Sequence, residues 1–183
     1  MTENNTRQEG DTQDYSVDRL SETIGILTRR ETEARILIPI LRDLGEAFGK
    51  AAVLETVSRT IMNIAEEQGR ELAKFMGGNT AKDFKEALAF WTRDDALEIE
   101  MKESAFQTLC FNVTRCRYAE MYRALGASDL GAVFSCNRDA ALIRGFNPGA
   151  VMERNKTIMA GHPVCDFRYT FPGDQGEPSA DGF

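Results

Sequence analysis

The stretch Asp95-Ala-Leu-Glu-Ile-Glu-Met-Lys102 marks the point where the sequence changes from a helical to a strand-like pattern. Its apolar residues alternate with charged ones, which is the period of a strand with one buried face. The segment that follows, 106–114, is rich in residues that favour strands. We therefore predict a β-hairpin, with its turn near Glu103 and Ser104.

The chain before this hairpin has a helical pattern. Apolar residues recur every three or four positions from Val17 to about Met76 and predict three helices, with a fourth at 80–90. Pro39 is expected to start a helix or to kink one, and Gly77 with Gly78 to end the third helix. The apolar stripes that we assign to a core are Leu20, Ile24 and Leu27; Ile36, Ile40, Leu44 and Phe48; and Val57, Ile61, Ile64, Leu72 and Phe75.

Two helices and a second hairpin are predicted after the first hairpin. The helices cover 116–125 and 129–144 and end at Gly126 and Gly145. The second hairpin pairs 150–159 with 164–171 and is closed by Gly161-His162-Pro163. The expected fold class is α+β, with an N-terminal helical layer followed by a β-β-α-α-β-β unit that holds a small antiparallel sheet.

Length and composition fit one domain. The chain has 183 residues, 42% of them hydrophobic and 28% charged, as in an ordinary globular protein. We expect a single domain at 16–171, between a disordered tail at 1–15 and a flexible tail at 172–183, because both ends are polar or rich in Gly and Pro.

Charge and hydropathy limit the classes of partner that the protein is expected to bind. The formal net charge is -7 and Lys and Arg form no cluster, which argues against nucleic acid. No apolar stretch is long enough to span a membrane, and the N-terminus does not look like a signal peptide, so we expect a cytoplasmic protein. The expected partner is a small-molecule substrate. A body this small would gain from a second copy that helps to complete its pocket, so a homo-oligomer is expected.

The strong nucleophiles lie in the second half of the chain. All four cysteines, Cys110, Cys116, Cys136 and Cys165, fall there together with the single histidine, His162. No Cys pair has the close spacing of a structural zinc site, and no phosphate-loop or zincin motif occurs. We therefore expect free thiols, with no metal and no cofactor.

Two helices each pair a thiol with a carboxylate. Cys116 and Glu120 are four residues apart, and Cys136 and Asp139 are three apart, so each pair shares a helix face. A carboxylate beside a thiol acts as a general base or acid when both face one pocket. The alternative is that the thiols fill a core and the carboxylates lie in solvent.

Charged residues in the last hairpin have two explanations. Arg154 or Arg168 could hold a substrate carboxylate with two hydrogen bonds, or could pair with Asp166. In a strand, Cys165 points to the opposite face from Asp166 and Arg168, so only one of these sets can line a cavity.

The second half of the chain resembles the L-2-amino-thiazoline-4-carboxylic acid hydrolase family. The segments that carry the resemblance are Cys116–Gly126, Leu130-Gly131, Ser135-Cys136, Asp139, Gly145–Pro148, Arg154, Lys156-Thr157 and Cys165–Tyr169. Ala34–Pro39 and Phe48-Gly49 are similar to it as well. The resemblance implies hydrolysis of a carbon–nitrogen or carbon–sulfur bond in a cyclic, amidine-like acid.

The implied reaction opens a ring. Water adds to the ring carbon that bears the amino group, and one ring bond to that carbon then breaks. Cleavage of the bond to sulfur leaves N-carbamoyl-cysteine, and cleavage of the bond to nitrogen leaves the S-carbamoyl isomer. A non-catalytic small-molecule sensor of the 4-vinyl-reductase type is the alternative, and the lack of a fused effector segment favours the enzyme.

The reaction needs a base, an acid and a partner for the amidinium group. The residues expected to supply these roles are Glu120 or Asp139 as amidinium partner and proton shuttle, one of Cys116, Cys136 and Cys165 as nucleophile, Arg154 or Arg168 as carboxylate clamp, and Asn147 as hydrogen-bond donor.

Overall fold

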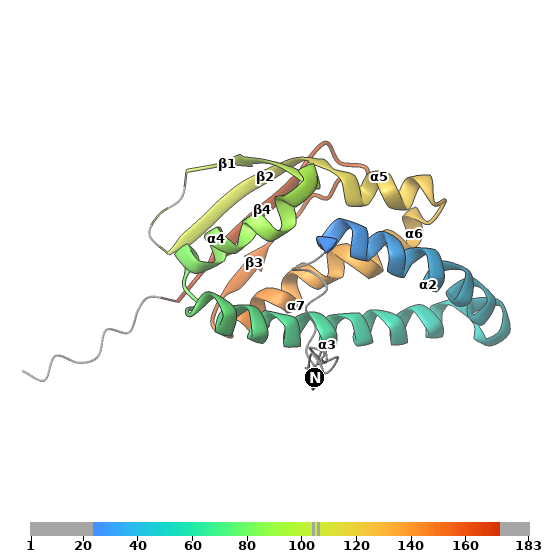
Figure 1. The fold of residues 1–183 in the computed structure, drawn as a ribbon. Coiled ribbons are helices and arrows are strands. Elements are labelled where there is room, and N and C mark those ends of the chain that lie inside the picture. Colours follow the sequence, from blue (N-terminus) through green and yellow to red (C-terminus); the bar gives the residue numbers. More distant parts are fainter. Residues whose placement is uncertain (1–23, 104, 106, 173–183) are drawn as a thin grey trace, which may run out of the picture.

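The computed structural model describes residues 24–103, 105 and 107–172. The predicted tails at 1–15 and 172–183, apart from Pro172, lie outside the described residues, and so does part of the turn predicted near Glu103 and Ser104. The fold is α+β, as predicted (Figure 1). Its helical layer consists of α2 (Ile26–Phe48), α3 (Lys50–Met76) and α4 (Ala81–Thr92). None of the described helices is long and apolar enough to cross a membrane.

A four-stranded antiparallel sheet follows the helical layer. The strands β1 (Leu97–Met101), β2 (Thr108–Cys116), β3 (Val151–Glu153) and β4 (Cys165–Thr170) are arranged in the order β1-β2-β4-β3. Between β2 and β3 the chain forms α5 (Arg117–Ala124), α6 (Ser128–Gly131), the π-helical turn η2 (Ala132–Cys136) and α7 (Asn137–Phe146). The predicted β-β-α-α-β-β order is thus confirmed.

Two cores hold these layers together. The first lies between one face of the sheet and helices α4 and α7, and it is rich in aromatic rings that include Phe84, Phe111, Phe146, Phe167 and Tyr169. The second lies among α2, α3, α5 and α6 and includes Ala34, Ile38, Leu41, Tyr122 and Phe134. A cavity lies between the helical layer and the sheet.

Helices α3 and α7 approach closely at two glycines. A Cβ atom at Gly145 would lie 1.8 Å from the Glu66 carbonyl oxygen, and one at Gly69 would lie 2.1 Å from the Leu142 carbonyl oxygen. The prediction that Gly145 ends a helix is therefore wrong, because α7 continues to Phe146. Gly145 is needed for the helix crossing rather than for a turn.

The predicted core face of α2 is also wrong. Ile36, Ile40, Leu44 and Phe48 are exposed, and the buried residues of this helix include Ala34, Ile38 and Leu41. The helix carries two apolar stripes, and periodicity alone does not tell which one packs inward. In α3, Ile64 and Phe75 of the predicted stripe are likewise exposed.

Pro39 lies inside α2 and starts no helix. A proline at this position leaves the carbonyl of Arg35, four residues earlier, without its helical donor. Both residues are exposed, so water can satisfy that carbonyl. The predicted helix around Leu20 lies outside the described residues, and Leu27 belongs to α2.

Three element boundaries differ from the predictions. Cys116 ends strand β2 instead of starting a helix. The predicted helix at 129–144 is divided into α6, η2 and α7. Strand β3 stops at Glu153, because the Asp166 carboxylate accepts hydrogen bonds from the backbone N–H groups of Asn155 and Lys156 and so takes them out of the sheet.

Candidate functional site

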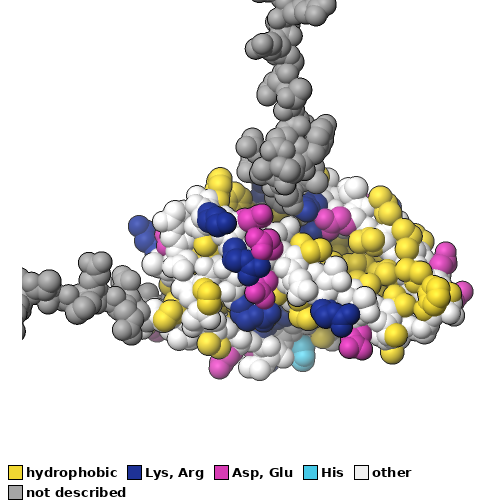
Figure 2. Space-filling model, turned by 90° about the horizontal axis from the view of Figure 1, so that it is seen from below, with side chains coloured by type: hydrophobic (Ala, Val, Ile, Leu, Met, Phe, Trp, Pro, Cys, Tyr) yellow, Lys and Arg dark blue, Asp and Glu magenta, His cyan; other side chains and the backbone are white. Residues whose placement is uncertain are grey.

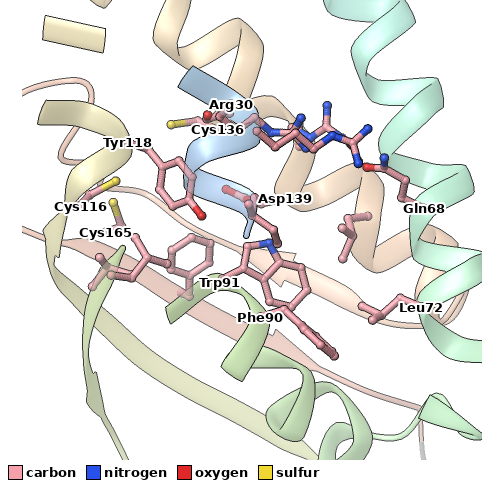
Figure 3. Close-up of a pocket in the computed structure, with 18 of the residues that line it drawn as sticks. Arg30, Gln68, Leu72, Phe90, Trp91, Cys116, Tyr118, Cys136, Asp139 and Cys165 are labelled. Atoms are coloured by element: carbon pink, nitrogen blue, oxygen red, sulfur yellow. Dashed lines mark hydrogen bonds between the residues drawn. The ribbon is translucent and has the colours of Figure 1, made fainter. Parts of the chain in front are cut away.

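A cavity of about 270 Å³ lies between the helical layer and the sheet. Every layer contributes to its wall: Arg30 from α2, Gln68 from α3, Trp91 from α4, Asp139 from α7 and Cys165 from β4. Figure 3 shows Cys116 and Cys165 beside Tyr118 at one end, Gln68 and Leu72 at the other, and Asp139 between them.

Asp139 and Arg154 form an ion pair in the wall of the cavity. The Arg154 guanidinium donates to the Asp139 carboxylate and also to the Cys136 carbonyl at 3.0 Å, and it lies over the Phe167 ring at 5.0 Å from the centroid. The Asp139 side chain remains 31% accessible although protein surrounds it. Burial raises the pKa of Asp139 even though Arg154 acts in the opposite direction. Asp139 is therefore a carboxylate that can take up a proton inside the cavity.

Three thiols share this cavity. Cys116, Cys136 and Cys165 all line it. Burial raises the pKa of Cys116 to about 11 and that of Cys136 to about 12. Burial also raises the pKa of Cys165, whose sulfur accepts a hydrogen bond from the Ile158 backbone N–H at 3.2 Å. All three are protonated at neutral pH, so they form a soft, uncharged wall.

A buried cation faces the same space. Arg138 is 7% exposed and donates to the neutral side-chain amide of Gln68. Among the described residues, no carboxylate lies within ion-pair distance of it, whereas the neighbouring Arg30 pairs with Glu33. Burial, followed by the charge of Arg30, lowers the pKa of Arg138 to about 10, so it stays charged at neutral pH. A buried guanidinium held by a neutral amide favours an anionic ligand.

Unpartnered polar atoms border the site. In the described part of the chain, Tyr118 Oη and Arg154 Nε are buried and lack a hydrogen-bond partner. Both residues line the cavity. Such groups cost free energy when they stay unpaired, so a polar ligand that reaches them would gain affinity.

Local structure explains how these side chains reach the cavity. The π-helical turn η2 ends at Cys136, directly before α7, which brings in Arg138 and Asp139. Single π turns inside helices are frequent at functional sites. In β4, the alternation of the strand turns Cys165 and Phe167 toward the cavity and leaves Asp166 and Arg168 half-buried on the other face, as the sequence predicts.

The structure brings together five of the eight predicted site residues: Cys116, Cys136, Asp139, Arg154 and Cys165. The other three, Glu120, Asn147 and Arg168, are not among the lining residues. Glu120 is exposed and pairs with Arg115 at 2.8 Å. Asn147 donates to the Asn79 carbonyl at 2.9 Å, and Arg168 donates to the Phe111 carbonyl at 3.0 Å. His162 is exposed in its turn.

Most of the lining residues were not predicted as site residues from the sequence, and the polar and aromatic ones among them include Arg30, Trp91, Tyr118 and Arg138. Arg138 stands next to Asp139 in the sequence, and that adjacency was an available signal. Arg30 is one of two consecutive arginines on a helix, and its sequence context does not distinguish it from a solvent-facing residue. It becomes buried because α2 packs against α3, α4 and α5.

The arrangement supplies a proton acceptor, a cation for an anionic group and a flat aromatic wall at Trp91. No group of three or more His, Cys, Asp or Glu side chains in the described residues is placed to hold a metal ion.

A comparison with known protein families assigns the chain to one of them. The family model for L-2-amino-thiazoline-4-carboxylic acid hydrolase matches residues 29–169, well over half of the 183 residues. The chain belongs to this family. The match includes every residue of the cavity wall named above. No curated protein matches the chain. The family is named for a hydrolase, and membership of the L-2-amino-thiazoline-4-carboxylic acid hydrolase family therefore indicates a hydrolase.

Proposed function

We propose that the protein hydrolyses the ring of L-2-aminothiazoline-4-carboxylate, or of a close cyclic isothiourea acid, to an N-carbamoyl-cysteine product. The observation that carries the proposal is the juxtaposition of Arg138, a buried cation, and Asp139, an accessible carboxylate, in the wall of one cavity. The substrate carries a carboxylate and an amidine group, which these two side chains complement.

The size of the cavity suits such a ligand. A dry cavity of about 150 Å³ holds a benzene molecule. A cavity of about 270 Å³ has room for a small ring that carries an amino group and a carboxylate. The indole of Trp91 offers an apolar face to the ring, and the thiol wall offers a soft surface to its sulfur.

Asp139 acts as the base in the proposed mechanism. Its carboxylate accepts a proton from water as the water oxygen bonds to the ring carbon that bears the amino group. The substrate enters as the amidinium cation, so the tetrahedral adduct is neutral. It collapses when the bond from that carbon to sulfur breaks: the electron pair goes to sulfur, which takes the proton from Asp139. The added hydroxyl becomes the urea carbonyl and releases its proton to solvent, which balances the proton that the amidinium brought in. Arg154 stabilises the carboxylate of Asp139, and Arg138 holds the carboxylate of the substrate.

A direct assay tests the function. Purified protein is mixed with excess L-2-aminothiazoline-4-carboxylate, and the loss of ring absorbance and the appearance of free thiol are followed together. We expect both, because cleavage of the bond to sulfur frees a thiol. Loss of the ring without new thiol would assign the S-carbamoyl product instead, and tight binding without turnover would indicate a sensor.

The pH dependence follows from the environment of Asp139. A base must be deprotonated to act, so kcat/KM rises with pH as Asp139 loses its proton. Because burial raises the pKa of this carboxyl group, we expect the midpoint of the acid limb of the kcat/KM profile to lie above pH 3.8, the ordinary pKa of an aspartate. The measurement is a pH profile of kcat/KM, and a profile that stays flat down to pH 4 would contradict the assignment.

Arg138→Met tests the carboxylate clamp. We expect KM to rise about tenfold or more, because a bidentate contact to the substrate carboxylate is lost. The melting temperature should not fall, since a buried charge is replaced by an apolar side chain of similar length. Arg70→Met, on the exposed face of α3, is the matched control and should leave KM unchanged. An unchanged KM in Arg138→Met would remove this residue from the site.

Cys136→Ala tests whether a thiol attacks the ring. The pKa of about 12 leaves almost no thiolate at neutral pH, and the Cys136 carbonyl that binds Arg154 is kept in the variant. We expect kcat/KM to stay within about tenfold of the wild-type value. A loss as large as that caused by removing Asp139 would instead assign a covalent route through this cysteine.

A further inference from the structure

The Tyr118 hydroxyl is buried in the wall of the cavity without a hydrogen-bond partner. The side chain is 7% exposed, and no described protein group bonds to its Oη atom. Tyr118 lies in the first turn of α5 and lines the cavity. A buried hydroxyl without a partner is unfavourable for folding. Its place in the cavity wall therefore indicates that it serves a ligand.

A second tyrosine on the same helix shows the usual arrangement. Tyr122 lies four residues after Tyr118, on the same face of α5, and is 1% exposed. Its hydroxyl accepts a hydrogen bond from Ser135 at 3.4 Å, and Tyr122 is not among the residues that line the cavity. The hydroxyl that serves packing thus has a protein partner, and the hydroxyl that faces the cavity has none.

The Arg154 Nε atom is the other unpartnered buried atom in the described part of the chain, and it is less suited to a ligand. The Arg154 guanidinium already donates to Asp139 and to the Cys136 carbonyl, and it lies over the Phe167 ring. The Tyr118 hydroxyl makes no hydrogen bond to the protein and can turn about its C–O bond toward a ligand.

Tyr118 and Asp139 face the same space. Figure 3 shows the Tyr118 hydroxyl directed toward the Asp139 side chain. Burial is the main cause that raises the pKa of Tyr118 above its ordinary value of 10, and the negative charge of Asp139 adds to the rise. The hydroxyl therefore stays protonated at neutral pH and can donate a hydrogen bond. Since the two side chains are not hydrogen-bonded to each other, an atom between them can contact both.

We propose that the Tyr118 hydroxyl donates a hydrogen bond to the oxygen atom that water adds to the ring carbon. This assignment rests on the proposed hydrolysis, in which Asp139 takes a proton from that water. The added oxygen becomes more negative as it releases its remaining proton to solvent and turns into the urea carbonyl oxygen. A fixed donor at this atom stabilises the transition state more than the substrate, because the substrate does not yet carry the oxygen. Tyr118 gives up no proton and forms no covalent bond.

Tyr118→Phe removes only the hydroxyl and is the first test. We expect kcat to fall about 100-fold and KM to stay within about threefold of the wild-type value, because the bound substrate lacks the oxygen that Tyr118 contacts. The melting temperature should stay the same or rise, since the lost hydroxyl has no protein partner. Tyr122→Phe is the matched control and should keep wild-type kinetics, although it loses the contact with Ser135. A kcat within about threefold of the wild-type value, or a kcat that falls together with the melting temperature, overturns the proposal.

The pH profile of Tyr118→Phe separates this role from support of Asp139. A hydroxyl that donated to the Asp139 carboxylate would stabilise its charged form, so its removal would raise the pKa of Asp139. We expect the acid limb of kcat/KM in Tyr118→Phe to keep the wild-type midpoint. A midpoint that moves to higher pH would overturn the proposal, because Tyr118 would then act through Asp139.

A binding measurement tests the same contact without turnover. Trp91 is the single tryptophan of the chain and lines the cavity, so its fluorescence reports binding there. The proposed product, N-carbamoyl-cysteine, carries the carbonyl oxygen, and we expect Tyr118→Phe to bind it about tenfold more weakly than the wild type. Figure 2 shows basic and acidic side chains side by side on that face of the molecule, so this face offers no patch of one charge that would compete for the anion.

The two proposals fail in different ways. A wild type that binds N-carbamoyl-cysteine but does not turn over the substrate would overturn the proposed hydrolysis, while weaker product binding by Tyr118→Phe would support the hydrogen bond. Equal product binding by wild type and Tyr118→Phe would overturn the hydrogen bond even in an active enzyme. A wild type that binds neither substrate nor product would overturn both.

Discussion

Replacing Asp139 with asparagine is expected to lower kcat/KM for L-2-aminothiazoline-4-carboxylate by about 100-fold or more, because general-base catalysis typically contributes 10²–10⁴. Asparagine keeps the shape of the side chain but cannot accept the proton of the attacking water. The loss should fall mainly on kcat, since ring binding depends more on Arg138 and the apolar wall.

Asp129→Asn is the matched control for this variant. Asp129 is an exposed carboxylate that pairs with Lys50 at 2.8 Å and is not among the residues that line the cavity. Its removal should leave the kinetics unchanged. Because Asp139→Asn also leaves Arg154 without its carboxylate, thermal unfolding of each variant must be measured. Wild-type kinetics in a folded Asp139→Asn protein would rule this residue out as the base.

Gly145→Ala is expected to destabilise the fold by about 3 kcal/mol, which corresponds to a fall in melting temperature of roughly 10 °C. Alanine in an open helix position would instead add up to about 1 kcal/mol of stability. At this crossing the new Cβ would lie 1.8 Å from the Glu66 carbonyl oxygen, so α3 and α7 must move apart. Since α7 carries Asp139, activity should fall as well.

Gly45→Ala is a suitable control for Gly145→Ala, because Gly45 is also helical but its Cβ would meet Lys50 Cα at an ordinary 3.5 Å. We expect this control to be neutral or slightly stabilising. If Gly145→Ala also unfolds at or above the wild-type temperature, the close crossing of α3 and α7 is not a determinant of stability.

Alternation and helical periodicity were sufficient to predict the α+β fold and its element order. Leu97 and Ile99 alternate with glutamates, and the expected hairpin of β1 and β2 is present. Periodicity did not identify the buried side of α2, because that helix is apolar on two sides and its partners α3 and α5 come later in the chain. The π-helical turn η2 was not predicted because a single additional residue in a helical turn leaves no clear periodic signal.

Site residues could be predicted where their spacing within a helix is enough to place both side chains on the same face. Cys136 and Asp139 lie three residues apart on adjoining helical turns, and both line the cavity. Cys116 and Glu120 do not line the same cavity. Cys116 belongs to strand β2, so the helical spacing assumed for this pair does not apply. Arg30 reaches the site only through the packing of α2 against distant elements, and local sequence carries no signal for such long-range contacts.

A crystal structure of Asp139→Asn with L-2-aminothiazoline-4-carboxylate tests the central claim most directly, because a slowed variant retains its substrate. The account predicts that the ring lies in the cavity against Trp91, with its carboxylate on Arg138 and its amino-bearing carbon nearest to position 139. A substrate bound outside this cavity, or bound within it with its carboxylate toward position 139, would contradict the account.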